Sequence, residues 1–319
     1  MRWKNKLLIL LIMLSACRGR EVTPLDSEKA GVKTLNYAHP ESLIEVDELL
    51  AIQNNEDIRI IDFREREAFD QGHLEGAIPL WRSDIEDHTH HVRGMMATKS
   101  EIEKLLSSHG ISSKDSLILY DDQGNVNAAR LWWVLRTYGF NQVRLLNGGL
   151  QSWQNEKGEV SIAYEPRPEG SFRFPLRDAP HLKIEKDSLH SLLVAEHGTL
   201  IDARTTDEHS GKRIKKGAKT AGRIPGSINI DWAHAVDFHG TKKFRTLEEL
   251  TKVYKGLPED KDTPVVVYCH SGVRSAHTFF VLTQLLGYTR VYNYDGSWLE
   301  WSASEGAPIE KDSTTLILQ

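Results

Sequence analysis

Short apolar runs alternate along this chain with longer segments whose apolar residues surround most of a helical turn. The short runs are typical of strands buried on both faces of a sheet, and they comprise Ile58 to Asp62, Leu117 to Tyr120, Leu200 to Asp202 and Val265 to Tyr268. Two longer segments, Ala128 to Tyr138 and Ser275 to Leu286, are each followed by a glycine, which commonly ends a helix. The alternation predicts α/β domains with mainly parallel sheets.

The same pattern occurs twice. Residues Leu117 to Trp153 match Val265 to Trp301 at a constant offset of 148 residues. Further upstream the offset changes from 140 to 150, which locates an insertion between His209 and Gly222, around the basic stretch Lys212 to Lys216. A repeat of this length indicates a duplicated domain rather than a solenoid of short units.

The repeat predicts the domain organisation, and a length of 319 residues agrees with two domains. We expect a first domain at residues 38–160 and a second at 176–319, joined by a linker at 161–175. The segment Tyr164 to Gly170 contains two prolines and two glutamates, a composition typical of linkers.

The first residues have the anatomy of an export signal. Arg2, Lys4 and Lys6 precede an apolar run, Leu7 to Leu14, that is too short to span a bilayer core of about 20 helical residues. The run ends in Leu14-Ser15-Ala16-Cys17, which resembles a bacterial lipobox and implies lipid attachment to Cys17. We therefore expect a lipoprotein signal at 1–17, a tether at 18–37, and a membrane-anchored protein in the cell envelope, facing the periplasm or the outside. The alternative is an ordinary cleaved signal.

Charge and cysteine content narrow the function. A net charge of −5 provides no field that would attract nucleic acid, so no nucleic-acid partner is expected. The chain has two cysteines, and lipid would consume Cys17, so the mature protein contains no internal disulfide. The remaining thiol, Cys269, is either an inert buried side chain or a reactive one.

The surroundings of Cys269 favour reactivity. Cys269 directly follows a predicted strand and leads through His270, Ser271, Gly272, Val273 and Arg274 into a predicted helix. Such a loop turns backbone N–H groups inward, and the helix dipole adds positive potential, so both stabilise a thiolate. Ligands of open parallel sheets bind beyond this end of the strands. In the other copy, Asp121 and Val126 replace Cys269 and Arg274, which predicts one working site and one scaffold domain.

At these residues the chain resembles the rhodanese family of sulfurtransferases over both halves. In the second half the resemblance lies in the cysteine loop and in three motifs, Asp202-Ala203-Arg204, Gly222 to Asn229, and Tyr294-Asp295-Gly296-Ser297-Trp298-Leu299-Glu300-Trp301. In the first half it lies in Asp62, Arg64, the segment Gly72 to Ala77, and Asn147 to Leu150 with Trp153.

The resemblance implies two tandem rhodanese-like domains, each with a mainly parallel five-stranded sheet flanked by helices. It also implies that Cys269 faces the boundary between the domains and becomes a persulfide. The partners are then a small anionic sulfur donor, of the thiosulfate or 3-mercaptopyruvate type, and a thiol or cyanide acceptor. The loop amides would cradle the persulfide and Arg274 would help to position the donor. Neither a cofactor nor a metal is expected, and we expect a monomer.

Four further residues of the second domain, Asp202, Arg204, Glu208 and Arg223, are candidates for substrate binding or for structural roles. Asp202 and Arg204 could instead form an internal ion pair at a strand end. Glu208 stands where related enzymes place a substrate-binding arginine, and the cysteine loop matches neither the thiosulfate nor the mercaptopyruvate pattern. The donor is therefore left open.

Two other functions compete with sulfur transfer. Phosphatases and arsenate reductases hold phosphate in a cysteine-to-arginine loop, but five residues lie between those two residues in such loops. Four residues separate Cys269 from Arg274, which makes a smaller ring of amides suited to one sulfur atom. The second rival is a membrane-anchored sulfur-binding or redox-sensing module that does not turn over substrate.

Three weaker features remain. His88, His90 and His91 are more typical of a solvated loop than of a metal site. The basic stretch Lys212 to Lys219 either rims the active site or simply faces solvent. Trp132 and Trp133 fall on a predicted helix of the first domain, where they indicate core or interface packing.

Overall fold

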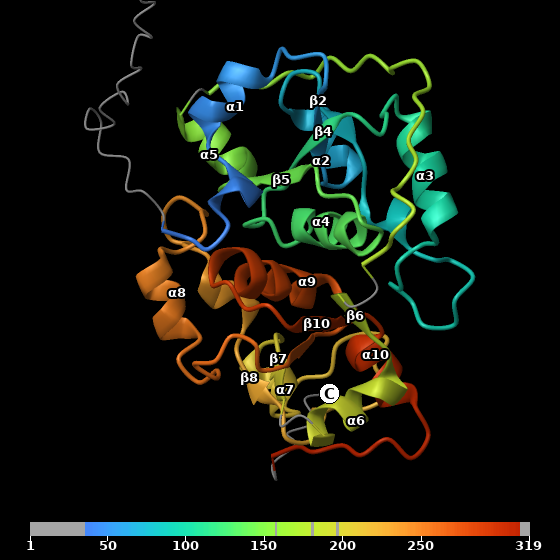
Figure 1. The fold of residues 1–319 in the computed structure, drawn as a ribbon, viewed down its shortest axis with the longest axis vertical. Helices are drawn as coiled ribbons and strands as arrows, with labels where there is room; N and C mark the ends of the chain where they lie inside the picture. Colours follow the sequence, from blue (N-terminus) through green and yellow to red (C-terminus); the bar gives the residue numbers. More distant parts are fainter. Residues whose placement is uncertain (1–35, 157, 180–181, 196–197, 313–319) are drawn as a thin grey trace, which may run out of the picture. The chain divides into compact units, whose positions relative to one another are not determined.

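Two five-stranded sheets, both entirely parallel, follow one another along the chain (Figure 1). The computed structural model describes residues 36–156, 158–179, 182–195 and 198–312. The strand order is β1-β5-β4-β2-β3 in the first sheet and β6-β10-β9-β7-β8 in the second, so the two sheets have the same topology. Both sheets belong to one compact unit. The predicted pair of parallel α/β domains is confirmed.

The first domain contains five strands and five α-helices within the described residues. They are β1 (Leu43–Ile44), α1 (Val46–Ile52), β2 (Ile58–Asp62), α2 (Arg66–Gln71), β3 (Ile78–Pro79), α3 (Lys99–Ser108), β4 (Ser116–Tyr120), α4 (Ala128–Thr137), β5 (Val143–Leu146) and α5 (Gly149–Glu156). A short 3-10 helix, η2 (Arg82–Ile85), follows β3.

The second domain repeats this order. Its elements are β6 (Lys183–Ile184), α6 (Lys186–Ala195), β7 (Thr199–Asp202), α7 (Thr206–His209), β8 (Ile228–Asn229), α8 (Leu247–Val253), β9 (Val265–Tyr268), α9 (Val273–Phe280), β10 (Val291–Tyr294) and α10 (Ser297–Ala303). The helix predicted at Ser275 to Leu286 begins two residues earlier, at Val273. Its last part, Val281–Leu285, is a π-helix, in which the Leu286 amide donates to the carbonyl of Val281.

Side chains alternate between two apolar layers along each central strand. In β4, Leu117 and Leu119 lie in one core cluster, whereas Ile118 and Tyr120 lie in the cluster on the opposite face. In β9, Val265 and Val267 lie in the first cluster and Val266 and Tyr268 in another. Buried parallel strands covered by helices on both faces require this arrangement. The next residue in the β9 alternation is Cys269, which therefore faces the first cluster.

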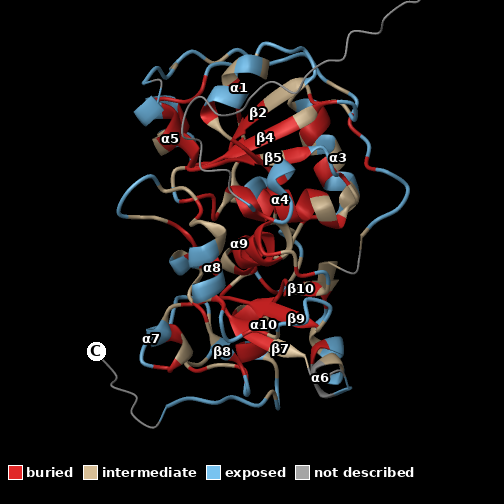
Figure 2. Ribbon diagram, turned by 60° about the vertical axis from the view of Figure 1, so that its left-hand side comes forward, coloured by how far each residue is buried: buried red, intermediate tan, exposed pale blue. Residues whose placement is uncertain are grey.

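The two domains meet at helices α4 and α9, which are buried along most of their length (Figure 2). The Trp132 ring packs against Phe279 and Phe280, with ring centroids 6.4 and 4.9 Å away. One apolar cluster therefore runs through both domains. The prediction that Trp132 and Trp133 serve the core or the interface is confirmed, since both are buried.

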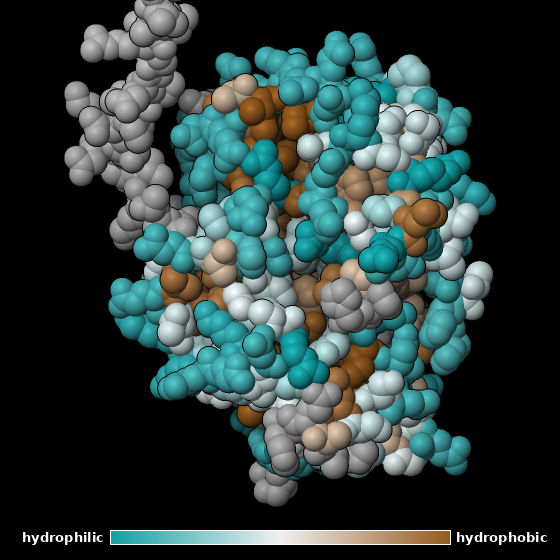
Figure 3. Space-filling model, viewed as in Figure 1, coloured by the Kyte–Doolittle hydropathy of each residue, from teal (hydrophilic) through white to brown (hydrophobic). Residues whose placement is uncertain are grey.

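The segment predicted as a linker runs along the first domain. Phe172 and Phe174 are buried, and their rings lie 5.1 Å from those of Phe140 and Tyr138 respectively. The predicted signal at 1–17, with Cys17, and nearly all of the tether at 18–37 lie outside the described residues. Within the described ranges, no helix is long and apolar enough to cross a membrane. Hydrophilic side chains cover most of the face shown in Figure 3, with hydrophobic ones visible mainly in its hollows.

Candidate active site

Cys269 lies at the carboxyl end of β9, a central strand of the second sheet, in the loop that leads into α9. The residue is only 1% exposed, yet it lines a cleft of about 640 Å³ that has walls from both domains. The thiol is thus reached through this cleft. The expected position, at the strand end and facing the domain boundary, agrees with the structure.

Hydrogen bonds to Ser297 hold the start of the loop. The Ser297 hydroxyl accepts from the amides of Cys269 (3.1 Å) and Gly272 (3.2 Å) and donates to the carbonyl of Tyr294 (2.7 Å). Gly272 has a φ of +78°, which favours glycine. A Cβ there would also lie 2.6 Å from a carboxylate oxygen of Asp295 and 2.9 Å from the guanidinium of Arg130. Both the backbone path and the available space therefore require glycine at this position.

The groups around the sulfur stabilise a thiolate. Burial opposes ionisation, but Arg274, the Ser275 hydroxyl and the amides of Ser275 and Ser271 outweigh it and hold the pKa of the Cys269 thiol below its ordinary value. The Ser275 hydroxyl lies 3.5 Å from the sulfur. A thiol that is reachable from a cleft and has a lowered pKa is suited to act as a nucleophile.

The first domain shows what the equivalent loop can hold. The Asp121 carboxylate, at the position of Cys269, accepts from four backbone amides at 2.7 to 3.1 Å: those of Gln123, Asn125, Asn127 and Ala128. Burial raises the pKa of Asp121 to about 6, so the carboxyl is still ionised at neutral pH. The amides of this loop type thus point inward and bind an anion, as the sequence predicts.

Arg274 has a partner that the sequence analysis did not expect. Its two terminal nitrogens donate to the two carboxylate oxygens of Glu208, at 2.7 and 2.9 Å. Burial alone would raise the pKa of Glu208, but Arg274 lowers it to about 2, so the pair is ionised. Glu208 is also held by the capping box it forms with Thr205 at the start of α7. Because both ends of the guanidinium fork are occupied, Arg274 acts on the thiolate through its charge and is not free to bind a donor in the expected way.

Other cations line the cleft instead. They are Arg82 and Arg93 from the first domain, and Lys215, Lys216 and Lys219 from the insertion in the second. Burial lowers the pKa of Arg82, and its Nε atom is buried without a hydrogen-bond partner among the described residues. A terminal nitrogen of Arg82 pairs with the Glu86 carboxylate, which also lines the cleft, at 3.7 Å. Of the two alternatives for the basic stretch, the structure therefore supports the one in which its lysines rim the cleft.

His270 and Ser271 also line the cleft, but His270 does not add a charge. Burial lowers the pKa of His270 to about 4, and its Nε2 atom lies 3.1 Å from the carbonyl of Lys216. The ring is neutral at neutral pH, and it joins the cysteine loop to the insertion. Val273 completes the lining of the loop.

The remaining candidates of the second domain have structural partners. Arg204 forms the expected internal ion pair with Asp202, at 2.6 Å, and donates to the carbonyl of Gly222. The Asp202 carboxylate also accepts from the Tyr268 hydroxyl (2.9 Å), and all three side chains are buried. Arg223 pairs with Glu310 and Asp312 and does not line the cleft. These residues support the scaffold beneath the loop.

The histidine cluster does not form a metal site. No group of three metal-ligating side chains occurs in the parts of the chain that the structure describes. His90 and His91 stack on each other with centroids 4.5 Å apart, and His91 reaches the cleft.

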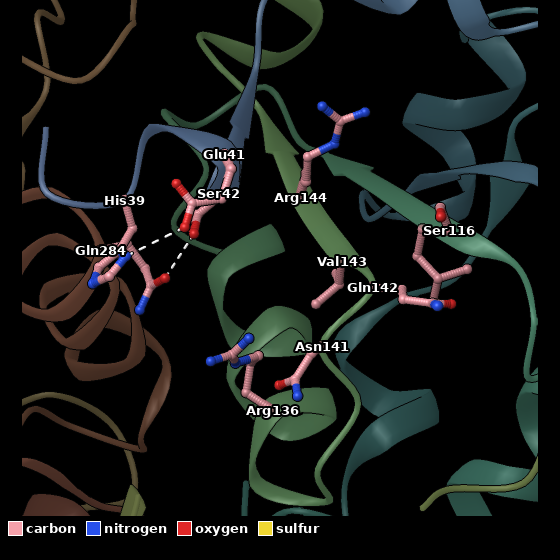
Figure 4. A pocket seen from close by; sticks show the side chains of 11 residues that line it. His39, Glu41, Ser42, Ser116, Arg136, Asn141, Gln142, Val143, Arg144 and Gln284 are labelled. Carbon is pink, nitrogen blue, oxygen red and sulfur yellow. Dashed lines mark hydrogen bonds and ion pairs between the residues drawn. The ribbon is translucent and has the colours of Figure 1, made fainter. Parts of the chain in front are cut away.

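A second recess, of about 510 Å³, opens where the domains meet away from Cys269 (Figure 4). Arg136, Gln284 and Ser42 line it, and the Ser42 hydroxyl donates to the side-chain oxygen of Gln284 (2.6 Å). Its lining holds no cysteine, and its one carboxylate, Glu41, lies 3.3 Å from the His39 ring. Cys269 lines the other cleft.

Fold and site together define a class of protein: tandem α/β domains in which one copy carries a thiol of lowered pKa beside the amides of Ser271 and Ser275. The model of the rhodanese-like domain matches residues 45–156 and 185–304, and the chain belongs to this family. It is a sulfurtransferase.

Known relatives cover almost the whole chain. A protein named sulfur carrier protein TtuD from Thermus thermophilus is 37% identical over 87% of this chain and 99% of its own length. A thiosulfate sulfurtransferase from Corynebacterium glutamicum is 36% identical over 88% of this chain and 93% of its own. Among solved structures, YnjE has the same fold, with a TM-score of 0.75, 23% identity, and coverage of 88% of this chain and 70% of its own.

Proposed function

We propose that the protein transfers a sulfane sulfur from a small anionic donor, of the thiosulfate or 3-mercaptopyruvate type, to a thiol or cyanide acceptor through a persulfide on Cys269. The observation that carries the proposal is a thiol with a lowered pKa at the floor of a cleft lined by cations. Names of relatives, among them thiosulfate sulfurtransferase and sulfur carrier protein, support the same chemistry.

With thiosulfate as donor, the Cys269 thiolate attacks the outer sulfur and a new S–S bond forms. The S–S bond of thiosulfate breaks, and sulfite leaves with the electron pair. An acceptor thiolate then attacks the outer sulfur of the persulfide, which yields the acceptor persulfide and regenerates the Cys269 thiolate. Inward amides of the loop stabilise the charged sulfur in both states.

We assign the binding of the donor's anionic end to Arg82 rather than to Arg274. Arg82 reaches the cleft from the first domain and pairs with Glu86 at 3.7 Å through one terminal nitrogen, whereas Glu208 occupies both arms of the Arg274 fork at 2.7 and 2.9 Å. A cleft of about 640 Å³ falls in the range that holds drug-sized ligands, which is more than a small donor needs. The remaining space leaves room for the acceptor.

A donor panel on the protein lacking residues 1–17 tests this function. Wild type is expected to turn over one sulfur donor, and Cys269→Ser is expected to abolish turnover. High-resolution mass spectrometry should find one added sulfur atom on Cys269 after donor treatment. A gain of oxygen without turnover would support the sensor function, and Cys269-dependent phosphate release would support a phosphatase.

The assignment of Arg82 has its own control. Arg82→Met is expected to raise the KM for the donor about tenfold or more, because a desolvated charge pair is lost. Arg223→Met, which removes a cation that lies outside the cleft and pairs with Glu310 and Asp312, should leave the KM unchanged. Equal KM values for wild type and Arg82→Met would rule out the assignment.

The export signal supports a location for this activity. We propose that the protein is anchored to a cell-envelope membrane by lipid on Cys17, with both domains facing the periplasm or the outside. Metabolic labelling with a radioactive fatty acid should label wild type and not Cys17→Ala. Labelling of both proteins, or of neither, would contradict the anchor.

A further inference from the structure

One side chain of the first domain reaches the cysteine loop from behind. Arg130, on α4, pairs with Asp295 of the second domain at 2.6 Å, and both side chains are 2% exposed. The same guanidinium lies 3.4 Å from the carbonyl of Gly272 and 3.0 Å from that of Gly94. Arg130 does not line the cleft. It contacts the loop that carries the nucleophile, but not the space that substrates occupy.

Asp295 connects this pair to both domains. Its second carboxylate oxygen accepts from the amide of Met96 in the first domain, at 3.0 Å. Two residues further on, Ser297 accepts from the amides of Cys269 and Gly272. The left-handed backbone of Gly272 packs directly on the Arg130–Asp295 pair. The position of the pair therefore determines where the middle of the loop lies.

The duplicated domain provides an internal comparison. Asn147 is the counterpart of Asp295, and it accepts from the amide of Phe244 at 3.1 Å, as Asp295 does from Met96. The counterpart of Arg130 is Thr278. The contact between the domains is thus made twice, once through a fully buried ion pair and once through the neutral Asn147 amide. Asn147 also donates to Glu45 at 2.7 Å, and the ion pair of Glu45 with Lys243 of the second domain is partly exposed. Since burying charges is costly, joining the domains does not by itself explain the pair. The Arg130–Asp295 ion pair is the contact that lies behind the loop containing Cys269.

We propose that Arg130, from the domain without the cysteine, is a positioning residue for sulfur transfer: it holds the Gly272 carbonyl and neutralises Asp295, so that the loop amides stay aimed at the Cys269 sulfur. The inference rests on Cys269 being the reactive thiol of the proposed function. Glu208 pairs with Arg274, and the charged side chains that line the cleft are Arg274, Arg82, Glu86, Arg93, Lys215, Lys216 and Lys219. Without Arg130, the buried carboxylate of Asp295 would lose its cation and place an uncompensated negative charge close to the cysteine loop.

The test compares Arg130→Met, Asp295→Asn and the double variant, which has an amide in place of Asp295, as at Asn147, and no cation opposite it. The rate of iodoacetamide alkylation against pH measures the pKa of the Cys269 thiol without requiring turnover. Arg130→Met is expected to raise this pKa by about one unit or more and to lower kcat for thiosulfate about tenfold, with a smaller change in KM. The double variant is expected to recover most of the pKa shift.

Two matched controls separate positioning from general stability. Arg59→Met removes an ion pair that lies within the first domain, with Asp115 at 3.2 Å, where the Asp115 side chain is buried. Arg136→Met removes a cation on the same helix as Arg130, at the recess of Figure 4. Both are expected to keep the wild-type thiol pKa, even where the Tm falls.

The inference is overturned if Arg130→Met lowers only the Tm, as Arg59→Met does, or if the double variant is no better than Arg130→Met in thiol pKa and kcat. Failure of the proposed function itself is recognised separately. In that case wild-type Cys269 would show an ordinary thiol pKa, or sulfur transfer would persist in Cys269→Ser.

Discussion

At the scale of single residues, Arg274 and Glu208 set the charge beside the nucleophile. The cation lowers the pKa of Cys269, and the carboxylate holds the cation in place with two hydrogen bonds. The pair thus combines a favourable charge with a fixed position, and its net charge is zero. The cleft has to obtain its attraction for anions from the other cations that line it.

Replacing Arg274 or Glu208 by a neutral residue should move the pKa of the Cys269 thiol in opposite directions. Arg274→Met removes the cation and leaves Glu208 unpaired, so the pKa of Cys269 is expected to rise by about one to two units. Glu208→Gln leaves the cation uncompensated and should lower that pKa. Transfer rates measured against pH will then rise at higher pH in the first variant and at lower pH in the second.

The double variant Arg274→Met/Glu208→Gln serves as the control, with an intermediate thiol pKa. If all three variants titrate like wild type, the ion pair does not control the nucleophile.

Residues of the loop could be predicted from sequence because they are contiguous and their geometry is local. Cys269, Gly272 and the inward amides follow from a strand, a short loop and a helix. Arg82 and Arg130 could not be found in this way, since only the packing of the two domains brings them to the loop. The repeat nevertheless contained a sequence signal for both residues. Their counterparts in the second copy are Trp232 and Thr278, so at both positions the first domain has a cation where the second has an uncharged residue.

At the scale of elements, the junction between β9 and α9 depends on one left-handed residue. Gly272→Ala would strain the backbone and place a Cβ against the Arg130–Asp295 pair. We expect a loss of about 3 kcal/mol or more in the free energy of unfolding. We also expect a loss of transfer activity of more than about tenfold.

Gly226→Ala is the matched control. Gly226 has a similar φ of +75°, but no atom of a neighbouring group lies within 4 Å of the place that a Cβ would take. Gly226→Ala should lower the free energy of unfolding by only about 1 kcal/mol and should retain the transfer activity. Denaturant unfolding and steady-state assays on both variants measure these effects. Equal losses in the two variants would show that space behind Gly272 is not limiting.

The insertion is the element whose role the sequence left undecided. Composition alone does not distinguish a basic stretch that faces solvent from one that lines a cleft, because both carry lysines. Its contact with the ring of His270, through the carbonyl of Lys216, depends on tertiary packing. The domain boundaries at 160, 175 and 176 stay predictions. The packing of Phe172 and Phe174 on the first domain shows why linker composition is a poor guide to where a segment lies.

At the scale of the whole molecule, His277 is one of the side chains that join the domains, beside the apolar cluster that runs through both. The His277 ring stacks on Phe244 with centroids 5.1 Å apart, and its Nε2 atom lies 3.2 Å from the carbonyl of Gly124 in the first domain. Burial lowers the pKa of His277 to about 3. The ring is therefore neutral in the folded protein, and Nε2 carries the hydrogen that it donates across the boundary.

This histidine makes stability depend on pH. Between its folded pKa of about 3 and the ordinary histidine value of about 6.5, only the unfolded chain binds the proton, so stability falls as pH falls through this window. Going from pH 6.5 to 4.5 should cost about 2 to 3 kcal/mol from His277 alone. His277→Gln keeps a donor for Gly124 and removes the titration, so its loss of stability over the same range should be smaller by about that amount.

Urea unfolding at the two pH values measures both proteins. His270, whose pKa burial lowers to about 4, keeps titrating in the variant, so part of the acid loss should persist. An unchanged pH dependence in His277→Gln would contradict this account of acid instability.

The occupied loop of the first domain has a consequence for how the second one works. The Asp121 carboxylate occupies the place that a charged sulfur would take in the second domain. Four backbone amides donate hydrogen bonds to this negative group without any substrate. If the second loop shares that geometry, it is already shaped for its loaded form, and taking up a sulfur atom demands little rearrangement of dipoles. The work of ordering the site is then done during folding, before any donor arrives.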